Sequence, residues 1–267
     1  MKISDHDKTT YHRDGVVKLS GVFDEKWIDF LRQATEECLN NPSEMAEEYA
    51  DRKKSTRFFG DQFLWIYNDK FKKFIMESEA AKIAARLMSA SKINMFFDHL
   101  LVKEPGSVEP TPWHQDAPYW KVKGTQVCSI WFAMDNVTEE TGGVRYVKGS
   151  HATGNRYRPQ SFSGKNNDNY DDSLLKVLPD IDATVPEDQI ICYDLQPGDC
   201  LVHNFNTIHG AKGNANSKVR RRGYATRWTG EDVVWDPRPG TTDIVSDPGL
   251  SPGDPMDSKL FPVVWRK

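Results

Sequence analysis

The chain has 267 residues, of which 38% are apolar and 28% charged, a composition typical of a folded globular protein and not of a disordered one. Its formal net charge of −4 excludes a general attraction to nucleic acid or to an anionic membrane. No apolar run reaches the roughly 18 residues that would span a bilayer, and the first eleven residues are too polar for a secretory signal. The four cysteines stand far apart, which predicts reduced thiols. We therefore expect a cytoplasmic protein that binds neither nucleic acid nor membrane.

Two segments with the apolar spacing of an amphipathic helix come first in the chain. Asp24 is a suitable N-cap, and the apolar residues after it recur with the spacing of an amphipathic helix as far as Cys38. This helix is expected to end near Asn40. A second stripe of the same period runs from Phe71 to Met88. The charged stretch between them, residues 44–54, is expected to be a solvated helix or a loop.

Short strand-like segments follow. Residues 93–103, 125–135, 200–203 and 223–229 are each apolar or aromatic, and Gly- and Pro-containing turns separate them. The segment 196–199 (QPGD) has Pro and Gly at the positions that a type II turn favours. Short strands of this kind favour an antiparallel barrel or sandwich, so the expected fold class is mainly β with flanking helices.

The apolar segments are not divided by a linker-like stretch, so we expect a single domain over residues 1–267. It would comprise a helical N-terminal part at about 1–92, a barrel core at about 93–230 and an irregular C-terminal tail at 231–267. The polar segment 153–172 is expected to be a mobile loop.

The segment 113–116 (WHQD) contains the most informative of the seven histidines. In an extended strand His114 and Asp116 would project from the same face, where a ring nitrogen and a carboxylate oxygen can share one metal ion. A third ligand would come from a strand that faces the first, and His209 and its rival His203 both lie in the right region. Two histidines and one carboxylate on one face of an octahedron form the donor set of non-haem iron(II) oxygenases.

Six segments in the same order resemble the phytanoyl-CoA dioxygenase family of iron(II)- and 2-oxoglutarate-dependent oxygenases, and the resemblance covers most of the chain. The segments are residues 11–17 (YHRDGVV), 114–116 (HQD), 131–135 (WFAMD), 142–151 (GG followed by GSH), 197–210 (PGD followed by IHG) and 220–222 (RRR). The resemblance implies a double-stranded β-helix, that is, a jelly roll similar to that of cupins. It also implies that Fe(II) is bound by His114, Asp116 and His209, with His209 favoured over His203 because the His-Gly pair follows the family pattern.

The resemblance further implies a site for 2-oxoglutarate. The family's arginine lies about a dozen residues beyond the distal histidine, where it binds the far carboxylate of the co-substrate. Counting from His209 favours Arg220, whereas aligning the strand that follows favours Arg221, and only one of two neighbours on a strand can point inward. Trp131 and Leu100 resemble positions that pack beside the co-substrate.

The implied activity is hydroxylation of a small metabolite by molecular oxygen and 2-oxoglutarate, with release of succinate and CO2. Related halogenases lack the carboxylate ligand, so Asp116 favours hydroxylation, or a desaturation or epimerisation by the same chemistry. The alternative is a cupin-like isomerase or hydrolase, which would use the same three ligands but would need no buried arginine.

Overall fold

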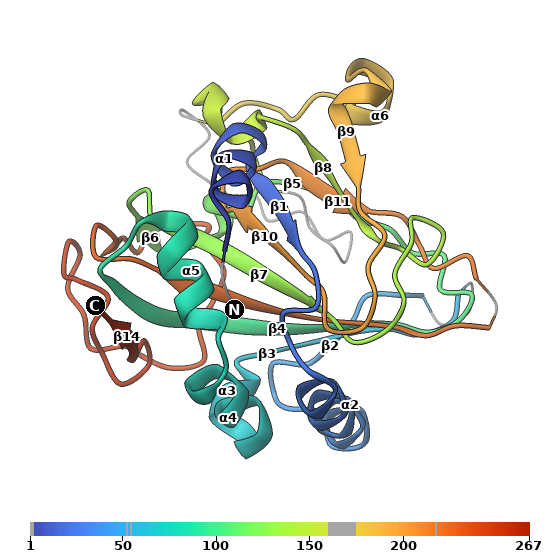
Figure 1. The fold of residues 1–267 in the computed structure, drawn as a ribbon, viewed down its shortest axis with the longest axis horizontal. Coiled ribbons are helices and arrows are strands. Elements are labelled where there is room, and N and C mark those ends of the chain that lie inside the picture. Colours follow the sequence, from blue (N-terminus) through green and yellow to red (C-terminus); the bar gives the residue numbers. More distant parts are fainter. Residues whose placement is uncertain (1–2, 52, 54, 160–174, 217) are drawn as a thin grey trace.

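The computed structural model of the chain describes residues 3–51, 53, 55–159, 175–216 and 218–267. Most of its strands join one major antiparallel sheet (Figure 1). These strands are β1 (Val16–Leu19), β2 (Glu47–Glu48), β3 (Phe58–Gln62), β4 (Lys92–Lys103), β7 (Val127–Ala133), β10 (Cys200–Asn204), β12 (Arg221–Thr229) and β14 (Val263–Arg266). Their order is β1-β10-β7-β12-β4-β3-β2, and β14 also pairs with β4.

A minor antiparallel sheet forms the second layer (Figure 1). It has the order β5-β11-β8-β9 and consists of β5 (Thr111–His114), β11 (His209–Ala211), β8 (Val144–Val147) and β9 (Ile190–Cys192). A separate two-stranded ribbon pairs β6 (Val122–Lys123) with β13 (Val234–Trp235). Strand pairing within the described residues does not close the two layers into a barrel. The two antiparallel layers with flanking helices confirm the expected mainly β, jelly-roll fold class, but the expected barrel is an open sandwich in the described residues.

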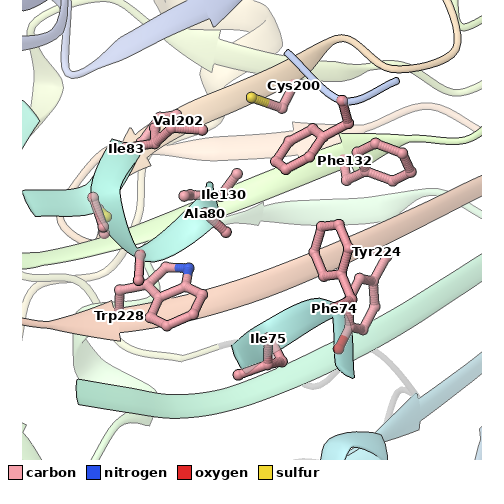
Figure 2. Close-up of a cluster of buried hydrophobic side chains, with 14 of the residues drawn as sticks. Phe74, Ile75, Ala80, Ile83, Ile130, Phe132, Cys200, Val202, Tyr224 and Trp228 are labelled. Carbon is pink, nitrogen blue, oxygen red and sulfur yellow. The ribbon is translucent and has the colours of Figure 1, made fainter. Parts of the chain in front are cut away.

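Helices cover the face of the major sheet that is turned away from the minor sheet (Figure 1). These helices are α1 (Asp5–Asp14), α2 (Glu25–Asn40), α3 (Leu64–Tyr67), α4 (Asp69–Glu77) and α5 (Ala80–Met88). Helix α6 (Ile181–Thr184) lies instead beside β9 of the minor sheet, and the 3-10 turns are η1 (Ala117–Tyr119), η2 (Ser150–Thr153) and η3 (Glu187–Gln189). Figure 2 shows how α4 and α5 pack on the sheet. The buried side chains in contact there include Phe74, Ile75, Ala80 and Ile83 of the helices and Ile130, Phe132, Val202, Tyr224 and Trp228 of the sheet.

The two predicted helical stripes are present, but the second consists of two helices. Helix α2 begins after Asp24, whose side chain accepts a hydrogen bond from Trp27 N at 3.1 Å. Residues 71–88 are divided between α4 and α5 because Ser78 adopts an extended backbone, and its hydroxyl oxygen accepts a hydrogen bond from Ala80 N at the start of α5. Both helices bury their apolar faces in the same core, so the sequence pattern continues across the break.

The four strands expected from residue 93 onward are present as β4, β7, β10 and β12. The N-terminal part expected to be helical also contributes β1, β2 and β3 to the major sheet, and the tail expected to be irregular contributes β13 and β14. Most of the expected mobile loop at 153–172 lies outside the described residues.

Two further expectations concern the thiols and membranes. All four cysteines are free, as predicted: Cys38, Cys128 and Cys200 are buried and Cys192 is half-buried. In the described part of the chain, no helix has both the length and the apolar character needed to cross a membrane.

Candidate metal centre and adjoining cavity

Three predicted ligands meet between the ends of two paired strands. His114 ends β5, His209 begins β11, and the two residues are direct partners in the antiparallel register. The His114 and His209 Nε2 atoms lie 3.9 and 4.0 Å from Asp116 Oδ1. One ligand atom from each of the three buried residues falls within 4.8 Å of the others.

The route by which the chain brings these groups together differs from the expected one. Strand β5 ends at His114, and Asp116 lies in the following turn with a helical backbone (φ −70°, ψ −38°). The pair therefore does not share one face of a strand. His209 also lies on the strand next to β5, not on a strand facing it. The three residues come together as expected. The expected placement of His114 and Asp116 on one strand, with the third ligand on a facing strand, was wrong.

Hydrogen bonds at Nδ1 set the tautomer and the orientation of both histidine rings. His114 Nδ1 lies 2.7 Å from the Pro112 carbonyl oxygen, and His209 Nδ1 lies 2.9 Å from that of Thr207. A carbonyl oxygen can only accept, so each Nδ1 carries the proton and donates it. The lone pair is then on Nε2, which is the usual arrangement of metal-binding histidines.

The two oxygens of Asp116 have different surroundings. Oδ1 faces the two histidine Nε2 atoms, whereas Oδ2 accepts a hydrogen bond from Ser129 Oγ at 3.1 Å and lies 3.2 Å from His203 Nε2. His203 Nδ1 in turn lies 3.2 Å from the Tyr146 hydroxyl. His203 is thus a hydrogen-bonding partner of Asp116, and Oδ1 is the oxygen available to a cation.

Burial sets the protonation of these groups. It lowers the pKa of His114 to about 3 and that of His209 to about 4, and a neighbouring histidine adds to the shift in each case. For Asp116, burial opposes ionisation, but His209 and the His203 hydrogen bond outweigh it and hold the pKa of the carboxyl well below its usual range. At neutral pH the site therefore presents two neutral imidazoles and one carboxylate. This donor set fits an Fe(II) site.

A cavity of about 870 Å³ opens beside the three ligands, between the major and minor sheets. Its volume is in the range of small-molecule binding sites. The lining residues from the major sheet include Phe97, His99, Leu101, Trp131, Ala225 and both Arg221 and Arg227; those from the minor sheet include Thr111, Val144, Gly210 and Ala211.

The two arginines considered for the co-substrate occupy different environments. Arg221 is 2% exposed, lines the cavity and donates from Nη1 to the Leu101 carbonyl oxygen at 3.2 Å, while its buried Nε has no hydrogen-bond partner among the described residues. Burial lowers its pKa to about 10, so it remains charged at neutral pH. Arg220 instead forms ion pairs with Glu36 at 2.7 Å and Glu104 at 2.8 Å, and it does not line the cavity. The geometry therefore favours Arg221.

The two residues expected to pack beside the co-substrate, Trp131 and Leu100, lie on opposite faces of the major sheet. Trp131 lines the cavity, with the Arg221 guanidinium 5.6 Å from its ring centroid. The Trp131 ring packs directly on the backbone of Gly223, where a Cβ would lie 2.0 Å from the ring, so no larger residue fits at this position. Leu100 packs in the helix-covered core, and its neighbour Leu101 lines the cavity in its place.

Three residues of the site were not identified from the sequence. Ser129 and Tyr146 complete the hydrogen bonds around Asp116 and His203, and Tyr49 holds the cavity residue His99 through a 3.1 Å hydrogen bond to its Nε2. Ser129 had a recognisable signal, since it is a polar residue in the middle of the apolar strand 125–135. Tyr49 and Tyr146 had none, because their partners are distant in sequence.

Residues 11–223 match the sequence profile of the family described as phytanoyl-CoA dioxygenase (PhyH). A curated relative, the multifunctional dioxygenase prhA of Penicillium brasilianum, is 24% identical over 227 residues, which are 80% of this chain and 68% of that protein.

Two solved structures from nogalamycin biosynthesis share the fold. The epimerase SnoN, in complex with Fe3+, alpha ketoglutarate and nogalamycin RO, is 19% identical with a TM-score of 0.77, and the match covers 98% of each chain. The alpha-ketoglutarate-dependent carbocyclase SnoK is 24% identical with a TM-score of 0.77, over 99% of this chain and 97% of that one.

Proposed function

The chain belongs to the phytanoyl-CoA dioxygenase family of iron- and 2-oxoglutarate-dependent oxygenase-type enzymes, and on that premise we propose that it is a dioxygenase that hydroxylates a small molecule. The overall reaction consumes the substrate, O2 and 2-oxoglutarate and releases the hydroxylated product, succinate and CO2. In this proposal His114, Asp116 and His209 hold Fe(II), and Arg221 binds the far carboxylate of 2-oxoglutarate.

The observation that carries the proposal is the combination of the three ligands with the buried cation Arg221 in one cavity. Arg221 is buried, and its Nε has no hydrogen-bond partner among the described residues, so its planar fork can donate two parallel hydrogen bonds to a carboxylate. A cupin-like isomerase or hydrolase has no use for such a group. SnoN, with the same fold, contains alpha ketoglutarate together with iron.

The chain's own residues prepare the site for this reaction. When bound, iron and 2-oxoglutarate supply the chemistry that reduces O2 and oxidises a C–H bond of the substrate. His203 and Ser129 hold Asp116 by its Oδ2, so that Oδ1 stays directed at the metal position. Trp131 and Leu101 provide apolar walls that exclude water from the co-substrate.

The proposal is tested with anaerobic protein and the co-substrates alone. Fe(II) with 2-oxoglutarate is expected to give a weak visible charge-transfer band, and exposure to O2 with candidate substrates is expected to release succinate. Asp116→Ala should lose both signals, because it removes the charged ligand. A wild-type protein that binds Fe(II) but gives no band with 2-oxoglutarate would contradict the proposal and favour the cupin-like alternative.

The reaction outcome needs a separate measurement, since the neighbours of the same fold include an epimerase and a carbocyclase. Mass spectrometry of the product distinguishes them. Hydroxylation adds the mass of one oxygen atom to the substrate. A further increase in product mass when the reaction is run under ¹⁸O2 would identify O2 as the source of that atom. Succinate release without added oxygen in the product would contradict the hydroxylase assignment while leaving the oxygenase-type chemistry intact.

A further inference from the structure

The cavity contains a second buried arginine, Arg227, which the proposed chemistry does not use. Arg227 is 8% exposed and lies on the same face of β12 as Arg221, six residues further along. Their guanidinium groups donate to different carbonyl oxygens, Arg221 to that of Leu101 and Arg227 to that of Ala225, and they lie against different rings, Trp131 and Phe97. The cavity thus has two separate positions for an anion.

Arg227 lies at the end of the cavity that holds the metal ligands. In the strand register it is the direct partner of Phe97 on β4 and of Ser129 on β7, and Ser129 is in turn opposite His203 on β10. Ser129 and His203 are the two residues that hold Asp116. A group bound to Arg227 would therefore lie next to the metal centre, where a substrate must bind.

The guanidinium of Arg227 is held in place but not neutralised. It lies 4.7 Å from the ring centroid of Phe97 and 5.9 Å from that of Trp120, and Nη1 donates to the Ala225 carbonyl oxygen at 3.1 Å. Among the described residues its buried Nε has no hydrogen-bond partner and no carboxylate forms an ion pair with it, although the charges of Asp116 and Asp98 act on it from a greater distance. Such an arrangement is unfavourable in a free protein unless a ligand completes it.

The charge balance of a site that holds the metal and 2-oxoglutarate also indicates an anionic ligand for Arg227. Two positive charges on the metal are balanced by Asp116 and by one carboxylate of 2-oxoglutarate, and the other carboxylate is balanced by Arg221. Arg227 is then left with Asp98 as its neighbouring buried carboxylate, which forms no ion pair with it and whose Oδ2 already accepts hydrogen bonds from Tyr224 and Trp65 N. Glu44, Glu47 and Asp243 also line the cavity, but all three are exposed at its mouth, where water and salt screen them.

We infer that the substrate carries an anionic group, of the carboxylate class, that binds Arg227, next to a flat apolar part that packs on Phe97 and Trp120. This inference rests on the proposed function, because it takes Arg221 as the site of the co-substrate. A planar carboxylate accepts two parallel hydrogen bonds from the guanidinium, and the two aromatic rings, 5.5 Å apart at their centroids, offer apolar surface beside it.

The test uses benzoate and its neutral isostere benzamide as probes. Both are titrated calorimetrically into the full chain, loaded with Mn(II) and saturated with 2-oxoglutarate so that Arg221 is occupied. Wild-type protein is expected to bind benzoate at least about tenfold more tightly than benzamide, as a charge-assisted hydrogen-bonded pair predicts. Equal affinity for the two probes would overturn the inference, and this comparison needs no variant.

Variants then assign the preference to Arg227. Arg227→Gln is expected to lower the ratio of the two affinities to about one, and Arg227→Lys to give an intermediate ratio because it keeps the charge without the planar fork. Arg222→Gln is the matched control: it lies on the same strand but pairs with Asp135 at 2.7 Å outside the cavity lining, so it should keep the wild-type preference. Thermal melting of each variant verifies folding.

Three results separate this inference from the proposed function. If the wild-type protein binds neither Mn(II) nor 2-oxoglutarate, the proposed function fails. If it binds both, but Arg227→Gln keeps its preference for benzoate, only the inference is overturned. If Arg227→Gln loses 2-oxoglutarate affinity instead, the inference and the assignment of Arg221 to the co-substrate both fail, whereas the oxygenase-type function stands.

Discussion

The two faces of β12 differ in chemistry although they alternate along the same nine residues. Tyr224 and Trp228 face the helices and pack, fully buried, in the main core. Arg221 and Arg227 face the cavity, and each has a buried Nε without a hydrogen-bond partner among the described residues. The helix-covered face thus contains the burial that stabilises the fold, whereas the cavity face holds polar groups that await ligands. The difference indicates that stability and binding can be changed separately in this strand.

The largest expected effect is on the helix-covered face. Trp228→Ala removes a fully buried ring and leaves a void against α4 and α5, which should lower the free energy of unfolding by about 3–5 kcal/mol. Urea unfolding of the metal-free protein measures it. Trp131→Ala is the matched variant on the cavity face, and it should cost clearly less because the ring already borders open space. An equal or larger loss for Trp131→Ala would contradict the division between the faces.

The next effect is on co-substrate binding. Arg221→Met should weaken binding of 2-oxoglutarate to the Mn(II)-loaded protein by at least about a hundredfold, because two charge-assisted hydrogen bonds are lost. Its melting temperature should not fall, since a buried and unpaired charge is removed. Calorimetry and a thermal melt measure the two quantities.

Arg220→Met is the control for this experiment, because it removes the same charge one residue away. Its ion pairs with Glu36 and Glu104 are partly exposed, so the stability should change by less than about 1 kcal/mol and the affinity for 2-oxoglutarate should be retained. Loss of affinity in Arg220→Met alone would show that the wrong arginine has been assigned.

A smaller effect is expected from a residue that positions a ligand. His203→Ala should weaken metal binding by about 10- to 100-fold without abolishing it, because Asp116 keeps its bond to Ser129 but loses its second partner. His209→Ala should be much more damaging, since it removes a ligand. Metal titration of both variants, with melting curves, makes the comparison. The reverse order would mean that His203 is the third ligand.

The faces of β12 also show what the sequence could predict. Local periodicity and capping were sufficient for α2, and β4 was recognised as an apolar aromatic run. For the arginine, aligning the strand favoured Arg221 and counting from His209 favoured Arg220, so the sequence left the two open until the structure showed which one lines the cavity. Leu100 was predicted beside the co-substrate, but it packs in the helix-covered core and its neighbour Leu101 lines the cavity.

What the sequence did not predict depends on contacts between distant segments. Strand β1 is four residues long and gains its hydrogen bonds from β10, more than 180 residues later. The turn that redirects the chain after His114 is fixed by Gln115, whose side-chain amide donates to the Asn155 and Asn206 carbonyl oxygens. A family pattern places His114, Asp116 and His209 together without specifying that geometry, which explains why the ligand set was predicted and its backbone was not.

The smallest expected effect is the dependence of stability on pH, in which the two faces act in opposite directions. On the cavity side, burial lowers the pKa of His114 to about 3 and of His209 to about 4, below the ordinary value of about 6.5. The unfolded chain therefore takes up protons first as the pH falls, and stability is lost from about pH 6.5 downward. On the helix side, burial raises the pKa of Asp98 to about 6, so the folded state takes up this proton first and stability is gained between about pH 6 and 4.

Two histidines outweigh one carboxyl, so the metal-free protein should be less stable at pH 5 than at pH 7 in urea unfolding. Asp98→Asn should make this loss larger, because it removes the opposing group while its side-chain oxygen can still accept from Tyr224 and from Trp65 N. Saturating Fe(II) should make the loss larger again, since protons then compete with the metal for both imidazoles. A metal-free protein whose stability rises between pH 7 and pH 5 would show that Asp98, and not the ligand histidines, governs the acid response.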